Sequence, residues 1–169
     1  TPLMTRIMDA TLVLHGEHTI NASTFTAMVT SSTLANASQV VASAIGSLSG
    51  PLHGGANEKV IAMLQKIESK EEIRPWLDDT LKAKNVVWGM GHREYSVKDP
   101  RANILTDMVQ QLFDEREGGV TDIFEKAIEL EKACEEKLSH KGVYPNVDFY
   151  SGILYKEMYI PTDIFTPIF

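Results

Sequence analysis

Four histidines stand beside a glycine or at the end of an expected helix, and side chains at such breaks are open to a ligand. They are His15, His18, His53 and His92. Glycine lets the backbone approach a bound molecule closely, and an imidazole gains or loses a proton near neutral pH. Together the four indicate hydrogen-bonding or acid–base chemistry on a small molecule, although each one alone is as well explained as a structural histidine.

A zinc site is the first alternative for these histidines. His15 and His18 lie three residues apart with Glu17 between them. This spacing is neither H-E-x-x-H nor H-x-x-E-H, and the single Cys134 provides no cysteine pair. The pattern therefore disfavours a metal site.

Two charged residues extend the candidate chemistry, but neither is decisive alone. Asp148 stands at an expected helix start, where a carboxylate is more often a cap than a base. Arg101 alone is most simply a surface or ion-pair residue. Trp88 and Phe149 are more often core residues than ligand-stacking ones. Only a joint pattern of these residues would change those interpretations.

Apolar residues at three- and four-residue spacing predict helices almost throughout, hence an all-α fold. We expect Ser23 to cap one helix and residues 86–88 to form a short extended segment. The helix at 38–48 is rich in small residues, so we expect it to be buried against another helix, in the core or in an oligomer interface. Helices are expected at about residues 3–15, 24–29, 38–48, 57–67, 76–84, 100–113, 120–138 and 147–155.

The composition excludes several classes of protein. The 169 residues are 43% apolar, enough for a packed core, and a net charge of -7 argues against a nucleic-acid partner. The single Cys134 excludes an internal disulfide framework and fits a reducing compartment, so we expect a cytoplasmic protein. No apolar run reaches the roughly 18 residues that span a bilayer.

Four segments of the chain resemble the citrate synthase family, in the family's order. They are LHGEHTINAST (14–24), GPLHGGANE (50–58), GMGHREYSVKDPRA (89–102) and PNVDFYSG (145–152). A single short match such as G-H-R would be weak, but four in order over nearly the whole chain are specific.

The resemblance implies a role for each site residue. His53 would polarise the thioester carbonyl of acetyl-CoA, and Asp148 would remove the proton from the neighbouring carbon. His92 would donate to the ketone of oxaloacetate, while Arg101 would bind one of its carboxylates and His18 would also contact it. The adenine of CoA would lie against the backbone of Val86, Val87, Trp88, Gly89, Met90 and Gly91.

These residue types suit the reaction that the family performs. A carbon next to a thioester is a very weak acid, so a base at the carbon must act together with a donor at the oxygen where charge develops. An arginine offers two parallel hydrogen bonds that orient a dianion. The condensed thioester would then be hydrolysed to citrate and CoA. The resemblance implies no metal and no cofactor, since acetyl-CoA is a substrate.

The resemblance also implies an architecture. Residues 1–53 would belong to a large helical domain with dimer-interface helices, residues 54–156 to a small domain, and residues 157–169 would return to the large one. Family members are longer homodimers of the tricarboxylic acid cycle, and further substrate-binding arginines come from later segments, one of them from the partner subunit. The ends of this sequence look like cut ends, so we expect negligible activity from this piece alone.

Some positions depart from the family pattern, and two alternatives stay open. Met90, Glu94 and Ser96 are atypical, which affects the packing around His92 more than its role, and Glu17 replaces the more usual aspartate. The same motifs occur in 2-methylcitrate synthase, which uses propionyl-CoA. A folded piece without catalytic activity is the alternative from a different class.

Overall fold

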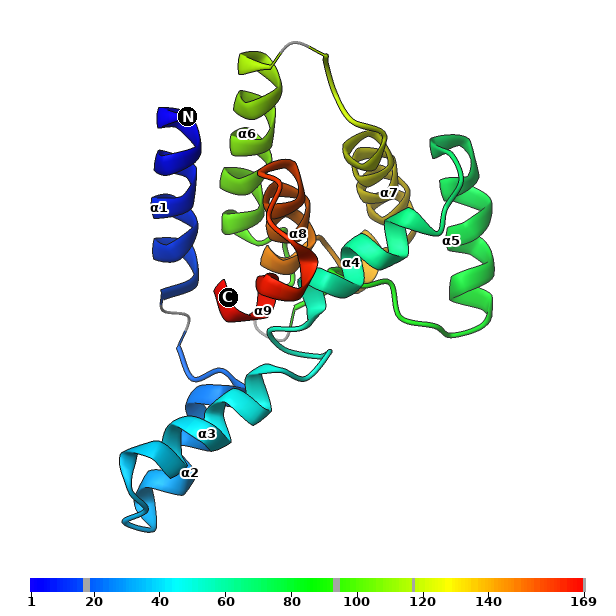
Figure 1. The fold of residues 1–169 in the computed structure, drawn as a ribbon. Coiled ribbons are helices and arrows are strands. Elements are labelled where there is room, and N and C mark those ends of the chain that lie inside the picture. The colour runs from blue at the N-terminus through cyan, green and yellow to red at the C-terminus, as the bar shows by residue number, and fades with distance from the viewer. Residues whose placement is uncertain (17–18, 93–94, 117, 169) are drawn as a thin grey trace.

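The computed structural model describes residues 1–16, 19–92, 95–116 and 118–168, and its regular elements are all helices (Figure 1). This confirms the all-α prediction. Within these residues the extended segments pair only at an isolated bridge between Met90 and Pro145. The α-helices are α1 (Pro2–Gly16), α2 (Ala22–Ser32), α3 (Ala37–Leu48), α4 (Ala56–Gln65), α5 (Ile73–Lys82), α6 (Pro100–Glu115), α7 (Asp122–Leu138), α8 (Val147–Glu157) and α9 (Phe165–Ile168), with short 3-10 turns at Lys70–Glu72, Ser139–Lys141 and Thr162–Ile164.

Helix α8 is the centre of the core. Nine of its eleven residues are buried, because α4 and α6 pack along it and α7 lies close by (Figure 1). A helix whose residues are buried on nearly every face must be surrounded by other elements, as α8 is. Helix α1 joins the core by burying Leu3 and Ile7, and α9 joins it by burying Phe165. In the part of the chain that the structure describes, no helix has both the length and the apolarity to cross a membrane.

Helices α2 and α3 form a hairpin that projects from the rest of the molecule (Figure 1). They pack against each other, yet neither has a buried residue. Of the two alternatives for residues 38–48, burial in the core of this chain is therefore wrong, and burial in an oligomer interface stays a prediction. Large apolar side chains stay exposed on both helices, among them Phe25, Met28, Val41 and Ile45.

One local prediction, the cap of α2, needs correction. The cap of α2 is Asn21, whose side chain accepts from the backbone N–H of Thr24, while Ser23 lies inside the helix. Residues 86–88 belong to no helix or strand, and the nearest pairing among the described residues is the bridge at Met90, so their extended conformation stays a prediction.

Candidate active site

Two segments that are far apart in the sequence pair next to the predicted site residues. The backbone N–H of Gly91 donates to the Tyr144 carbonyl at 2.8 Å, and the N–H of Asn146 donates to the Gly89 carbonyl at 2.9 Å. The side chain of Asn146 adds a third bond, from its Nδ2 to the Gly91 carbonyl at 2.8 Å. This pairing links the segment that leads into His92 to the segment that leads into α8.

Asp148 lies in the first turn of α8, where the sequence predicted a carboxylate at a helix start. The helix is capped by Asn146, whose Oδ1 accepts from the Asp148 N–H at 2.9 Å. The Asp148 Oδ1 is buried and accepts no hydrogen bond from the described residues. Burial raises the pKa of Asp148 to about 7, although the positive charge of Arg101 opposes the shift. Asp148 is thus a carboxyl group that can change its protonation state near neutral pH.

Arg101 is held by a carboxylate that the sequence reading did not single out. Asp99 accepts from Nη2 of Arg101 at 2.7 Å and from its Nε at 3.1 Å, and it also caps α6 through the Arg101 N–H. Burial disfavours the charged form of Asp99, but the hydrogen bonds from Arg101 outweigh it and its pKa is lowered. The hydrogen bonds of Arg101 found among the described residues do not involve Nη1, which could therefore bind another anion. The interpretation of Arg101 as an ion-pair residue is therefore correct. The ion pair does not exclude a role for Arg101 in binding substrate.

His15 lies in the same electrostatic neighbourhood. Its Nδ1 is 2.7 Å from the Thr11 carbonyl, which can only accept, so Nδ1 carries the proton. Burial lowers the pKa of His15, and Arg101 lowers it further. Its ring faces Tyr155 of α8 at 6.3 Å between centroids. His15 was one of the four histidines at sequence breaks, but no role could be assigned to it from the sequence.

His53 is fixed by the start of α2. The backbone N–H of Ser23 donates to Nε2 of His53 at 3.2 Å, and the Ser23 hydroxyl lies 2.9 Å from the same nitrogen. The single proton of that hydroxyl can go to Nε2 of His53 or to Oδ1 of the cap residue Asn21, which lies 2.8 Å away. An accepting Nε2 means that the neutral ring carries its proton on Nδ1. Burial lowers the pKa of His53, which favours this neutral form.

His92 has the opposite tautomer. The backbone N–H of Tyr95 donates to Nδ1 of His92 at 3.1 Å, so the neutral ring carries its proton on Nε2. The Tyr95 ring stacks on the imidazole at 4.6 Å between centroids. No role was predicted for Tyr95, which follows His92 by three residues and acts through its backbone N–H.

Two glycines allow the elements of the site to approach closely. A Cβ on Gly152 of α8 would lie 2.6 Å from the Asn57 carbonyl of α4, and real Cβ atoms do not come so close to backbone. Gly89 has φ +78, and a Cβ there would lie 2.8 Å from Cα of Phe149. Only glycine fits a positive φ with so little space. The loop before His92 therefore packs closely against the start of α8.

The predicted residues fall into three local groups. Asp148, Arg101 and His15 interact electrostatically, His53 is held by Ser23, and His92 is held by Tyr95. The contacts of the described residues do not join His53 to Asp148, so their convergence on one substrate stays a prediction.

The remaining predictions concern the CoA segment, His18 and a metal. In the CoA segment Val87 and Gly89 are buried and Val86 is 55% exposed. His18 and Glu94 lie outside the described residues. A search of the described residues for three or more clustered metal-binding side chains found none.

Comparison with known proteins defines the class. Residues 1–169 match the family model described as citrate synthase, C-terminal domain. A citrate synthase of Synechocystis sp. is 54% identical over 168 residues, covering 99% of this chain and 42% of the relative. One from Acidithiobacillus ferridurans is 50% identical, with 99% of this chain and 44% of the relative covered.

Solved structures agree with the sequence comparisons. Citrate synthase from Thermotoga maritima superposes with a TM-score of 0.88 at 39% identity, over 96% of this chain and 44% of that one. Citrate synthase from Thermoplasma acidophilum, solved as a ternary complex with carboxymethyl coenzyme A and oxaloacetate, superposes with a TM-score of 0.92 at 33% identity, over 99% of this chain and 45% of that one. The chain spans less than half the length of these relatives.

The protein is thus an all-α protein of the fold that citrate synthases have. The chain belongs to the citrate synthase family. This confirms the resemblance read from the four motifs.

Proposed function

We propose that this chain carries the catalytic residues of a citrate synthase, which condenses acetyl-CoA with oxaloacetate. The observation that carries the proposal is the state of Asp148: a buried Oδ1 without a hydrogen-bond donor among the described residues, and a pKa of about 7 caused by burial. A base works best when its pKa lies near the working pH. Asp148 would take a proton from the methyl group of acetyl-CoA, and the electrons of that C–H bond would form the enolate.

His53 would stabilise the enolate oxygen. Its Nε2 accepts from the Ser23 N–H, so its Nδ1 carries the proton that would be donated to the thioester oxygen. The lowered pKa supports a neutral donor. A fixed neutral donor helps because the developing charge meets an oriented dipole without a costly proton transfer.

His92 and Arg101 would hold the second substrate. The Nε2–H of His92 would donate to the ketone oxygen of oxaloacetate and make its carbon more electrophilic. Arg101 would bind a carboxylate through Nη1, since Asp99 occupies its Nε and Nη2. His18 would add a further contact, as the family pattern implies. The enolate carbon would then attack the ketone carbon, the electrons of the C=O bond would move to its oxygen, and the new alkoxide would take the Nε2 proton of His92.

The CoA moiety would lie along the backbone of residues 86–91, which leads directly into His92. Water would then cleave the thioester of citryl-CoA to release citrate and CoA. No step of this scheme needs a metal or a resident cofactor. The protein would act in the cytoplasm, in the tricarboxylic acid cycle.

We propose a homodimer built on the α2–α3 hairpin. Its exposed apolar side chains include Phe25, Met28, Val41 and Ile45, and a patch of this kind marks an interaction surface. The partner subunit would contribute an arginine to the oxaloacetate site. The division into residues 1–53, 54–156 and 157–169 belongs to the same proposal, with closure between the two domains excluding water.

Turnover of the complete enzyme that contains this chain tests the proposal. We expect release of CoA from acetyl-CoA only when oxaloacetate is present, and slower turnover with propionyl-CoA. Asp148→Asn should lower kcat by about 10³-fold, and in the unchanged enzyme kcat/KM should rise with pH through about 7 as Asp148 loses its proton. Unchanged turnover in Asp148→Asn would refute the assignment.

A further inference from the structure

Three side chains from three different elements form one cluster. Lys98 precedes α6, Glu131 lies in the middle of α7, and Tyr150 lies in the first half of α8. Nζ of Lys98 is 2.5 Å from Oε1 of Glu131, and the Tyr150 hydroxyl donates to Oε2 of the same carboxylate. The Lys98 ammonium also lies 5.4 Å from the centroid of the Tyr150 ring. Each oxygen of Glu131 thus has its own donor, and the proposed reaction uses none of the three side chains.

The cluster is largely shielded from solvent, which distinguishes it from an ordinary surface ion pair. Tyr150 is fully buried, and the side chains of Lys98 and Glu131 are 28% and 16% exposed. Exposed ion pairs hold their partners weakly because water competes for both charges, whereas shielded pairs are electrostatically stronger. Burial and the negative charge of Glu131 raise the pKa of Tyr150, so its hydroxyl stays protonated and keeps donating.

Lys98 connects the cluster to the residues that would bind oxaloacetate. The next residue is Asp99, whose carboxylate binds Arg101 and caps α6. The backbone N–H of Asp99 also donates to the Pro145 carbonyl at 3.3 Å, just before α8. A shift of Lys98 would therefore move Asp99 and the guanidinium group that Asp99 holds.

Tyr150 connects the cluster to the residue that would act as the base. It follows Asp148 by two residues in α8. Because Glu131 binds both Lys98 and Tyr150, one carboxylate on α7 joins the segment that carries Arg101 to the helix that carries Asp148. The charge of Arg101 acts on the pKa of Asp148, so the relative position of these two groups matters for both.

A second set of ion pairs on α7 lies away from the catalytic groups. Arg74 of α5 donates to Glu129 and to Glu136 of α7, and the side chains of Arg74 and Glu136 are 44% and 58% exposed. Helix α5 carries no residue of the proposed reaction. These exposed pairs therefore provide a matched control on the same helix.

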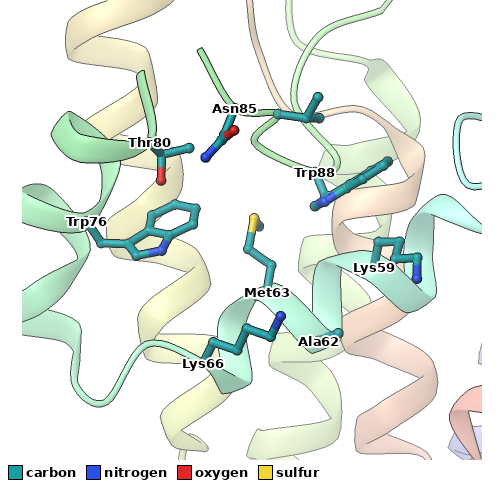
Figure 2. A pocket seen from close by; sticks show the side chains of 9 residues that line it. Lys59, Ala62, Met63, Lys66, Trp76, Thr80, Asn85 and Trp88 are labelled. Atoms are coloured by element: carbon teal, nitrogen blue, oxygen red, sulfur yellow. The ribbon is translucent and has the colours of Figure 1, made fainter. Parts of the chain in front are cut away.

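The cavity in Figure 2 is a separate feature of the molecule. It lies between α4, α5 and the segment 85–88, and its lining includes Trp88 of the predicted CoA segment. The described residues that line it do not include Lys98, Glu131 or Tyr150. A change at Glu131 therefore leaves the walls of this cavity intact, so effects on the two substrates can be measured separately.

We propose that Glu131 is a positioning residue of the site. Through Lys98 it fixes the segment that presents Arg101 to oxaloacetate, and through Tyr150 it fixes the start of α8. Glu131 itself contacts no substrate in this scheme. The inference rests on the proposed function, because that function assigns Arg101 and Asp148 to the substrates.

Glu131→Gln in the complete enzyme tests this role, because glutamine keeps the shape and an acceptor for Tyr150 but offers no charge to Lys98. We expect the dissociation constant of oxaloacetate, measured by calorimetry, to rise about tenfold, and the KM for acetyl-CoA to change less than about twofold. Glu136→Gln, the control on α7, should leave both values unchanged. Unchanged oxaloacetate affinity in Glu131→Gln would overturn the proposal, and so would an equal loss of affinity for both substrates.

Lys98→Met tests whether Glu131 acts through Lys98. It should weaken oxaloacetate binding about as much as Glu131→Gln, and the double variant should bind no more weakly than either single one, as expected for residues that act as one unit. Lys70→Met, which removes an exposed ion pair with Glu125 of α7, should have no effect. If the effects of the two changes multiplied, Glu131 would act independently of Lys98 and the proposal would fail. Circular dichroism and thermal unfolding of each variant separate a change of position from a loss of folded protein.

Turnover of the unchanged complete enzyme distinguishes the two possible failures. If this enzyme does not condense acetyl-CoA with oxaloacetate, the proposed function is wrong. If it does, but Glu131→Gln binds oxaloacetate as tightly as the unchanged enzyme, only the positioning role of Glu131 is wrong.

Discussion

At the scale of single residues, backbone hydrogen bonds determine which ring nitrogen of His53 and of His92 carries the proton. The N–H groups of Ser23 and Tyr95 donate to different nitrogens of their partners, so His53 is a donor through Nδ1 and His92 through Nε2. The sequence motifs identified both histidines but not these tautomers. A tautomer depends on which backbone group lies next to the ring, and for His53 that group is 30 residues away.

The raised pKa of Asp148 predicts a dependence of stability on pH. A pKa of about 7 in the folded state lies above the unfolded value, so folding favours the protonated acid. The preference of the folded state for protonated Asp148 contributes fully to stability below about pH 4. This contribution is lost as the pH rises through 7. Asp148→Asn should therefore raise the free energy of unfolding by up to about 4 kcal/mol at pH 8, but by less than about 2 kcal/mol at pH 5.

Urea unfolding of both proteins at the two pH values measures this difference. Asp107→Asn, at an exposed position on α6, is the matched control, because it removes a carboxyl group that is not buried. If the effect of Asp148→Asn did not differ between the two pH values, the Asp148 carboxyl group would be titrating at its ordinary pKa.

At the scale of elements, the helices with clear apolar periodicity were predictable to within a few residues. The helix expected at 3–15 is α1 at Pro2–Gly16, and the one expected at 100–113 is α6 at Pro100–Glu115. The exposure of α3 was not predictable, because small residues pack equally well in a core or on a surface. The pairing of residues 89–91 with residues 144–146 was not predictable either, since it joins segments with no shared pattern.

Asn146 connects two elements of the site, and this predicts a double effect of its loss. Its Oδ1 caps α8 and its Nδ2 binds the Gly91 carbonyl. Asn146→Ala should lower stability by about 1–2 kcal/mol, and it should also lower kcat of the complete enzyme because His92 and Asp148 lose a shared support.

The matched control is Asn36→Ala, which removes the cap of α3 away from the site. It should cost a similar amount of stability, measured by thermal unfolding, without the loss of kcat. Equal kcat in the two variants would show that Asn146 acts only as a cap.

The approach of α8 to α4 predicts that Gly152 cannot be enlarged. The added methyl group of Gly152→Ala would lie 2.6 Å from the Asn57 carbonyl, so the two helices must move apart. We expect a loss of about 2 kcal/mol or more in the free energy of unfolding. Gly16→Ala, with nothing within 4 Å of the new Cβ, should change it by less than about 1 kcal/mol. Chemical denaturation measures the free energy of unfolding of both variants. Similar losses in the two would contradict the close packing of α8 on α4.

At the scale of the whole molecule, this chain spans 42–45% of the length of the relatives compared here. The arginines that would complete the oxaloacetate site are expected outside it. The 169-residue chain alone should therefore show negligible synthase activity in a CoA-release assay. Turnover close to that of the complete enzyme would mean that the residues described above suffice.

A structure of the complete enzyme with oxaloacetate and carboxymethyl coenzyme A measures the central geometry most directly. The account predicts an Asp148 carboxylate oxygen within about 3.5 Å of the carbon that replaces the acetyl methyl group, with Nδ1 of His53 in hydrogen-bonding distance of the acyl oxygen. A closed complex in which either group lies more than about 6 Å from its target would contradict it.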